Sequence, residues 1–243
     1  DVLSASQYDD KIAWYENDGN QNFSTHIITP FAYAGHSISA LDLDGDGDID
    51  VLSAHSYDYN TSQITWFEND GNQNFTPHTI TTEAEDFVVS VYAVDVDSDG
   101  DLDVLSNTDL DKKIAWHEND GNQNFTPHAI ATNDDMYAYS VYAADVDGDG
   151  DMDVFAGSSG RIIAWYENYG NQNFTPITIT SDANGHLNSP QSVHAVDVDG
   201  DGDMDVLFAS SYDHKIDCYE NDGNQNFTPI TITTDVFSPN QFM

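Results

Sequence analysis

The sequence of 243 residues contains 44 aspartates and glutamates against 5 lysines and arginines, which gives a formal net charge of −39. A surface this acidic repels phosphate backbones and anionic lipids, so nucleic acid is excluded as a partner and membrane surfaces are poor ones. The single cysteine, Cys218, excludes an intramolecular disulfide, and no apolar run is long enough for membrane insertion. Stability must therefore come from sources other than a disulfide, and the length suits one large domain.

The chain begins with Asp1-Val2-Leu3, which matches Asp50-Val51-Leu52 at the end of an acidic loop further along. No signal peptide is visible before this point. We therefore expect a processed or excised piece of a longer precursor.

The segment 11–23 recurs with small changes at 63–75, 113–125, 162–174 and 215–227. A period of about 50 residues is typical of four-stranded propeller blades. We place the five copies at roughly 1–36, 37–88, 89–138, 139–190 and 191–243. The first copy lacks its first strand and its acidic loop.

The third copy illustrates the four strands predicted in each unit. Its segments 90–94, 104–106, 114–116 and 125–130 are rich in β-branched and aromatic residues and are bounded by Gly, Asn and Asp. An acidic loop joins the first two strands, and an Asn-Asp-Gly turn that suits positive φ joins the last two. No segment shows a sustained helical period. The sequence therefore predicts an all-β fold, a β-propeller of five four-stranded repeats.

The acidic loops, such as 42–50, each place five aspartates on alternating positions. A tight loop of this kind supplies the carboxylate and main-chain oxygens that Ca2+ prefers, and its glycine permits the sharp turn. A solvated turn would explain one such loop, but four copies with the same spacing favour metal. The fourth aspartate of each loop is expected to offer its main-chain oxygen. The predicted ligands of about four structural calcium ions are Asp42, Asp44, Asp46, Asp48, Asp50, Asp95, Asp97, Asp99, Asp101, Asp103, Asp145, Asp147, Asp149, Asp151, Asp153, Asp197, Asp199, Asp201, Asp203 and Asp205.

Antiparallel succession puts the acidic loops and the Asn-Asp-Gly turns on one face of the disc and all other links on the opposite face. The first face hardly changes among the copies, whereas the second, which we call the variable face, changes in length and residues. Repeats keep what folding needs and vary what function uses, so we expect a ligand there. Aromatic rings and hydrogen-bonding groups on this face suit a sugar. The candidate ligand-binding residues are Tyr8, Tyr33, His36, Tyr57, Tyr59, His186, Tyr212 and His214.

Two regular rows of side chains are interpreted as packing. The row on the third strand consists of Trp14, Trp66, Trp116 and Trp165, with Cys218 in the fifth copy. Such a row could be a platform for stacking sugars, but its regularity favours packing between blades. The row on the fourth strand consists of His26, His78 and His128, and its interchange with Ile177 and Ile230 also favours packing.

The motif Asp-x-Asp-x-Asp-Gly-x-x-Asp at 42–50, 95–103, 145–153 and 197–205 resembles that of the FG-GAP/VCBS repeat family. The resemblance covers essentially the whole chain and implies a calcium-binding, extracellular β-propeller. Members include integrin α-subunit heads, secreted bacterial adhesins, lectin-like proteins and polysaccharide lyases, so the family implies function only loosely. Five copies are fewer than the blades of an integrin head. Residues 236–243 either close the ring by pairing with 2–3 or lead into further blades.

We expect a secreted or cell-surface, calcium-stabilised binding module that recognises carbohydrate through the variable face. One alternative is a structural or adhesive module that binds an extracellular protein surface, as part of a larger cell-surface protein or as a homo-oligomer. A second alternative is a polysaccharide lyase, for which the link 182–190 is the best place to seek an acid–base cluster. No catalytic constellation is recognisable, so an enzyme is not expected.

Overall fold

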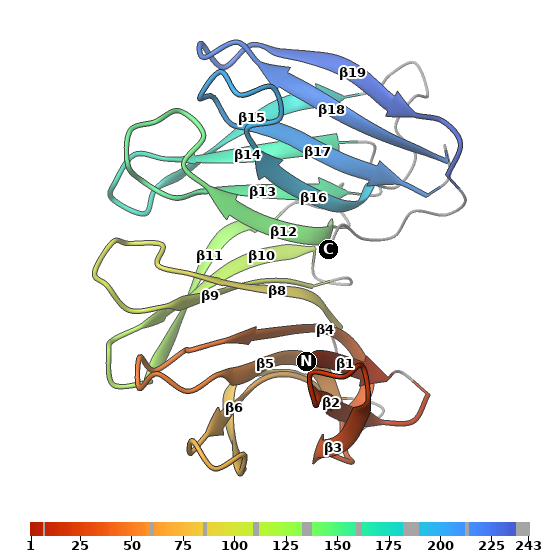
Figure 1. Ribbon diagram of the computed structural model, residues 1–243. Helices are drawn as coiled ribbons and strands as arrows, with labels where there is room; N and C mark the ends of the chain where they lie inside the picture. The colour runs from red at the N-terminus through yellow and green to blue at the C-terminus, as the bar shows by residue number, and fades with distance from the viewer. Residues whose placement is uncertain are drawn as a thin grey trace.

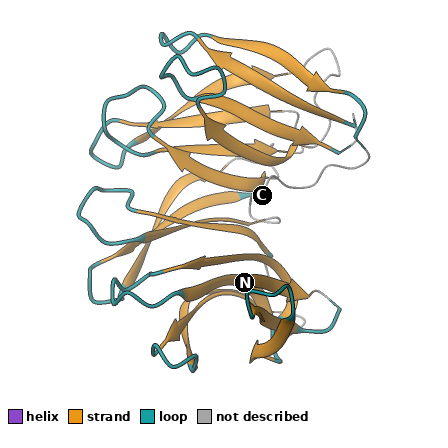
Figure 2. Ribbon diagram, in the orientation of Figure 1, coloured by secondary structure: helices purple, strands orange, loops and turns teal. Residues whose placement is uncertain are grey.

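The computed structural model describes residues 1–6, 8–58, 61–84, 87–108, 112–132, 138–158, 162–181, 190–211 and 214–236. Within these ranges the regular structure consists of strands without any helix, as Figure 2 shows. The predicted all-β class is therefore confirmed. These ranges contain no helix that is long and apolar enough to cross a membrane.

The strands form five antiparallel sheets in chain order (Figure 1), and we call each sheet a blade. Blade 1 contains β1 (Val2–Ser6), β2 (Lys11–Asn17) and β3 (Phe23–Thr29). Blade 2 contains β4 (Tyr33–Leu41), β5 (Asp50–Asp58), β6 (Thr61–Asn69) and β7 (Phe75–Ala84). Blade 3 contains β8 (Val88–Val94), β9 (Asp103–Thr108), β10 (Lys113–Asn119) and β11 (Phe125–Thr132). Blade 4 contains β12 (Ala138–Ala144), β13 (Asp153–Ser158), β14 (Ile162–Asn168) and β15 (Phe174–Ser181), and blade 5 contains β16 (Pro190–Val196), β17 (Asp205–Ser210), β18 (Lys215–Asn221) and β19 (Phe227–Thr233).

Successive blades meet through their innermost strands, which lie side by side in the order β1, β4, β8, β12 and β16 (Figure 1). Among the described residues β1 makes no comparable contact with β16, so closure into a propeller ring stays a prediction. After its last strand, blade 5 makes the same backbone hydrogen bond as blade 1 does at the equivalent position. The Val236 N–H donates to the His214 carbonyl at 3.3 Å, and the Ala32 N–H donates to the Asp10 carbonyl at 2.9 Å.

The hydrophobic core lies mainly between neighbouring blades. Trp165 is fully buried and packs in one cluster with Val193 and Phe208 of blade 5. Trp66 and Trp116 occupy the equivalent position in blades 2 and 3, and each is only 3 % exposed. This burial confirms the packing interpretation for the three indoles, because a sugar cannot stack on a ring that solvent does not reach.

The histidine row packs on the tryptophan row. In blade 2 the rings of Trp66 and His78 are stacked with centroids 4.7 Å apart, and His78 Nε2 lies 2.6 Å from Glu68 Oε2. The same arrangement joins Trp14, His26 and Glu16 in blade 1 and Trp116, His128 and Glu118 in blade 3. The histidines are therefore packing residues, as predicted, and their hydrogen bonds to glutamate are a further feature that the sequence did not reveal.

Candidate metal centres

Each acidic loop brings three carboxylates together. In the blade 2 loop, which joins β4 to β5, one oxygen from each of Asp42, Asp44 and Asp50 lies within 4.8 Å of the other two. The corresponding groups are Asp95, Asp97 and Asp99 in blade 3, Asp145, Asp147 and Asp149 in blade 4, and Asp197, Asp199 and Asp205 in blade 5. The first two aspartates of the motif belong to every group, whereas the third member is the fifth aspartate in blades 2 and 5 and the third aspartate in blades 3 and 4.

Backbone N–H groups inside the loop orient the carboxylates. In blade 2, Asp42 Oδ2 accepts a hydrogen bond from the Gly47 N–H at 3.0 Å, and Asp44 Oδ1 accepts one from the Asp46 N–H at 3.2 Å. Gly45 and Gly47 have φ values of 75° and 96°. Glycine adopts such angles without strain, so the loop can curl tightly around one point.

The fifth aspartate anchors the loop to the rest of the blade. Asp50 is fully buried, and its Oδ1 accepts from the Asn69 N–H at 2.8 Å while Oδ2 accepts from the Leu43 N–H at 3.1 Å. The same pair of bonds recurs at Asp103, Asp153 and Asp205. Burial outweighs these hydrogen bonds, so it raises the pKa of Asp103 to about 6 and that of Asp153 to about 7.

The fourth aspartate contacts the neighbouring turn. A Cβ atom added to Gly71 would clash with the Asp48 carboxylate, and Gly71 also has a φ of 72°. The same contact joins Gly121 to Asp101, Gly170 to Asp151 and Gly223 to Asp203. In blades 2 to 5 the acidic loop and the turn between the last two strands therefore touch on one face, as antiparallel succession predicts. Because its carboxylate lies against the turn, the fourth aspartate can offer a metal only its main-chain oxygen.

Substituting this turn glycine should destabilise the protein. We expect Gly121→Ala to lower the free energy of unfolding by about 1–2 kcal/mol, because alanine is strained at a left-handed φ. Displacement of the Asp101 carboxylate adds to this cost. Denaturant unfolding measures the total, and the same substitution in an Asp101→Ala background isolates the backbone contribution. An unchanged midpoint in Gly121→Ala would contradict the described contact.

Calcium fits the acidic loops. All the gathered donors are carboxylate oxygens, which hard divalent cations prefer. Asp42 Oδ1 is buried and has no hydrogen-bond partner among the described residues, a position that a bound cation would satisfy. In blade 2 the carboxylates of Asp42, Asp44, Asp46 and Asp50 would hold the ion. The ion would supply the positive charge that offsets their mutual repulsion.

In the presence of a chelator, the stability that Asp103 and Asp153 contribute should be lost as the pH rises from about 5 to 8. Burial lowers the pKa of His55 and His117 to about 4, so these two histidines oppose the loss up to their ordinary pKa of 6.5. Asp103 and Asp153 have folded-state pKa values of about 6 and 7, above the ordinary value of 3.8. The folded chain therefore keeps protons that the unfolded chain has already released, and the stability they contribute disappears as the pH passes the folded pKa. Thermal melts of the wild type and of Asp153→Asn at several pH values test this, because the substitution removes the Asp153 contribution and leaves both histidines in place. A difference in melting temperature between the two chains that does not change over this range would refute it.

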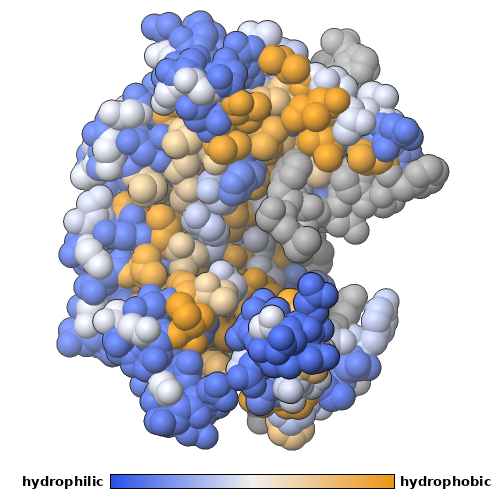
Figure 3. Space-filling model, in the orientation of Figure 1, coloured by the Kyte–Doolittle hydropathy of each residue, from blue (hydrophilic) through white to orange (hydrophobic). Residues whose placement is uncertain are grey.

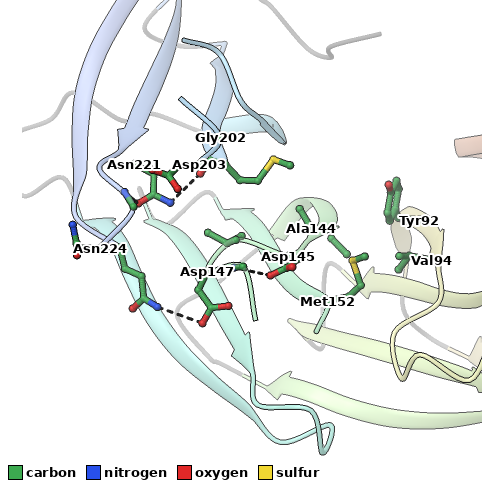
Figure 4. A pocket seen from close by; sticks show the side chains of 16 residues that line it. Tyr92, Val94, Ala144, Asp145, Asp147, Met152, Gly202, Asp203, Asn221 and Asn224 are labelled. Carbon is green, nitrogen blue, oxygen red and sulfur yellow. Dashed lines mark hydrogen bonds between the residues drawn. The ribbon is translucent and has the colours of Figure 1, made fainter. Parts of the chain in front are cut away.

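A cavity of about 680 Å³ lies between the blade 4 loop and the blade 5 turn (Figure 4). Asp145 and Asp147 line it from the loop, and Asn221 and Asn224 line it from the turn. Gln225 Nε2 lies 3.4 Å from Asp147 Oδ2 and links the two blades. This cavity could not be predicted from the sequence, because its walls come from different copies of the repeat.

The candidate sugar-binding residues are spread over several blades. Tyr8 follows β1 and is 91 % exposed, whereas Tyr33 lies half-buried at the start of β4. His36 is exposed in β4, with its ring centroid 6.3 Å from that of Phe87, and His214 is exposed just before β18. The backbone of Tyr57 belongs to β5. The other three candidates, Tyr59, His186 and Tyr212, lie outside the described residues, as does most of the link 182–190.

One model of a known protein family matches the chain. The model of the FG-GAP-like repeat matches residues 1–53, 42–106, 95–156, 145–208 and 197–241, so that successive matches overlap at the acidic loops. No curated protein matches the chain. Because the five matches together span nearly the whole sequence and coincide with five similar blades, the chain belongs to the FG-GAP-like repeat family.

Proposed function

We propose that the chain is a calcium-stabilised, extracellular binding module that recognises carbohydrate through its variable face. FG-GAP-like repeats along the whole chain support a repeat-based binding domain. The choice of carbohydrate as the ligand rests on one observation. Polar side chains on the metal-loop face bond to the protein itself, whereas polar and aromatic side chains on the variable face are exposed to solvent.

On the metal-loop face the scaffold itself uses the polar side chains. The Asp70 carboxylate, for example, accepts hydrogen bonds from the Asn72 N–H and from Asn74 Nδ2, both at 2.9 Å. On the variable face, Tyr8 reaches into solvent from a link that differs between copies, and His36 is exposed near the start of β4. An exposed aromatic ring stacks on the C–H face of a sugar, and an imidazole binds its hydroxyls. The variable face therefore has the groups that sugar recognition requires.

Calcium has a structural role in this proposal. Four divalent ions would offset about eight of the 39 net negative charges, and they would do so where the carboxylates are most crowded. The ions bind the folded chain and not the unfolded chain, so by linkage they stabilise the folded state. The variable-face residues lie at the opposite ends of the strands, so the ions support the ligand site without contacting the ligand.

A screen of glycans and polysaccharides, run with calcium and repeated after chelation, tests the proposal. We expect calcium-dependent binding to a defined sugar that weakens in Tyr8→Ala or Tyr57→Ala. The control is Tyr169→Ala, because Tyr169 is an exposed tyrosine in the blade 4 turn on the metal-loop face. If the folded protein binds no sugar, the proposal fails and an adhesive module with a protein partner takes its place.

A further inference from the structure

Three aromatic rings from successive blades lie against one another in a tilted arrangement along the innermost strands, with interplanar angles of 44° and 53°. The Tyr92 and Tyr142 rings lie with centroids 4.7 Å apart, and the Tyr142 and His194 rings 4.3 Å apart. We call Tyr92, Tyr142 and His194 the aromatic ladder. They occupy the same position in β8, β12 and β16, next to the buried valines of those strands. The ladder therefore lies on the inner face that these strands form.

The ladder lines a cavity of about 310 Å³ that four blades share. The other lining residues include Tyr139, Gln191 and the serines at 37, 90, 140 and 192, together with valines and an isoleucine. None of these lining residues carries a carboxylate, an ammonium or a guanidinium group, in a chain with 44 acidic residues. Tyr92 also lines the larger cavity of Figure 4. In Figure 3 the inner face is correspondingly pale and apolar, whereas the loops along its left edge are strongly hydrophilic.

Hydrogen bonds between neighbouring innermost strands join blade 2 to blade 3 and blade 4 to blade 5 beside the ladder. Ser37 Oγ on β4 accepts from the Val91 N–H on β8 at 3.2 Å. Ser140 Oγ on β12 accepts from the Val193 N–H on β16 at 3.4 Å. Each blade is thus held in register with a neighbour at the level of the cavity. A ligand that fits the ladder would meet a surface already ordered for it, which lowers the entropic cost of binding.

Tyr92 packs against the core between blades 3 and 4, and Tyr142 packs against the core between blades 4 and 5, but packing alone does not account for all three rings. In β4 the equivalent residue is Ser39, so this position accepts a small side chain without loss of the strand. The ladder residues are also only half-buried, unlike the tryptophans between the blades. Half-exposed rings at a position that does not require a ring are typical of a binding surface.

The chemistry of the cavity selects its ligand. Aromatic faces, hydroxyls and an amide bind a sugar ring through its C–H face and its hydroxyls. Burial lowers the pKa of His194, which favours the uncharged form of the imidazole. The surrounding acidity repels anionic polymers, and the lining offers no carboxylate to pair with a cationic one. A neutral ligand is therefore favoured.

We propose that the aromatic ladder is the binding subsite for a neutral oligosaccharide, which lies across the inner face of blades 3, 4 and 5. This inference rests on the proposed carbohydrate-binding function. It places the principal contact on the innermost strands, whereas Tyr8 and the other link residues would contact only the parts of the glycan that extend beyond the cavity.

The test uses the full chain with calcium and a panel of neutral hexasaccharides (cellohexaose, chitohexaose, xylohexaose and mannohexaose), with polygalacturonate as the anionic comparison. Isothermal titration should detect at least one neutral sugar, with an affinity that hardly changes with ionic strength. Tyr142→Ala should weaken this binding by about tenfold or more, while Tyr142→Phe keeps most of it. His194→Ala provides a second variant at the end of the ladder, and Tyr169→Ala is the matched control. Near-ultraviolet circular dichroism checks that each variant is folded.

The outcomes separate this inference from the function on which it rests. Loss of binding in the folded ladder variants, with binding kept in Tyr169→Ala, supports the subsite. If Tyr8→Ala or Tyr57→Ala abolishes binding while Tyr142→Ala and His194→Ala bind normally, the ladder subsite is wrong and the carbohydrate function stands. If the wild-type chain binds only polygalacturonate, the assignment of a neutral ligand is wrong. If it binds no sugar at all, both proposals are overturned.

Discussion

Chelation of calcium should lower the melting temperature of this protein by tens of degrees at low ionic strength. Four sites, each at a calcium concentration of about 100 times Kd, would together contribute about 11 kcal/mol to the folded state. For a chain of this size, each kcal/mol corresponds to roughly 2–4 °C, which gives a shift of about 20–40 °C. Without the ions, each loop crowds five carboxylates, and low salt leaves their repulsion unscreened. Differential scanning calorimetry with and without chelator measures the shift.

Salt provides the control for this prediction. High concentrations of sodium chloride should restore part of the lost stability by screening the carboxylates, whereas millimolar calcium should restore all of it. Magnesium should be less effective, because it demands a tighter octahedral geometry and releases its water reluctantly. A melting temperature that is the same with and without chelator would contradict the calcium assignment.

Trp165→Ala should cause the largest loss of stability among single substitutions of the tryptophan row. Trp165 is fully buried between blades 4 and 5, with the Phe227 ring edge-on to it at a centroid distance of 6.3 Å. Truncating a buried tryptophan leaves a cavity and costs about 3–5 kcal/mol. The loss should lower the denaturant midpoint without changing the slope of the transition.

Trp14→Ala is the matched comparison. Trp14 occupies the same repeat position in blade 1 and stacks on His26, but it is only half-buried. Its truncation removes less buried area and leaves a smaller cavity, so it should cost distinctly less than that of Trp165. Equal losses in the two variants would show that burial between blades is not the source of the stability. Cys218, the blade 5 counterpart, is already small and buried, so Cys218→Ala should cost less than either.

The repeat architecture could be predicted from the sequence because the same unit occurs five times. Each copy repeats the same alternation, the same acidic loop and the same turn, so that a misreading of one copy is corrected by the others. The packing of Trp66 and the contact between loop and turn followed from this repetition together with antiparallel succession. The first aspartates of each loop were likewise expected to converge, and the structure gathers them within 4.8 Å.

Features that depend on contacts between copies could not be predicted in the same way. In every blade the register of the outermost strand pair shifts at one position, for example between Ile12 and Ala13 in blade 1 and between Ile64 and Thr65 in blade 2. No turn residue in the sequence marks this register shift. The aromatic ladder was also missed, because its rings meet only when β8, β12 and β16 lie side by side. The available signal was the recurrence of a ring at one position of three copies, against Ser39 in a fourth.

The most direct test of the account is the number of calcium ions that the chain binds. Protein freed of calcium by a chelator is titrated with calcium in a calorimeter, and its metal content is measured by elemental analysis after dialysis. Both measurements should give four ions per chain, one for each cluster of three aspartates. Replacing Asp145 and Asp147 with alanine should remove one ion and leave three. A chain that stays folded and binds no calcium, or that keeps the same stoichiometry without these two carboxylates, would contradict the account.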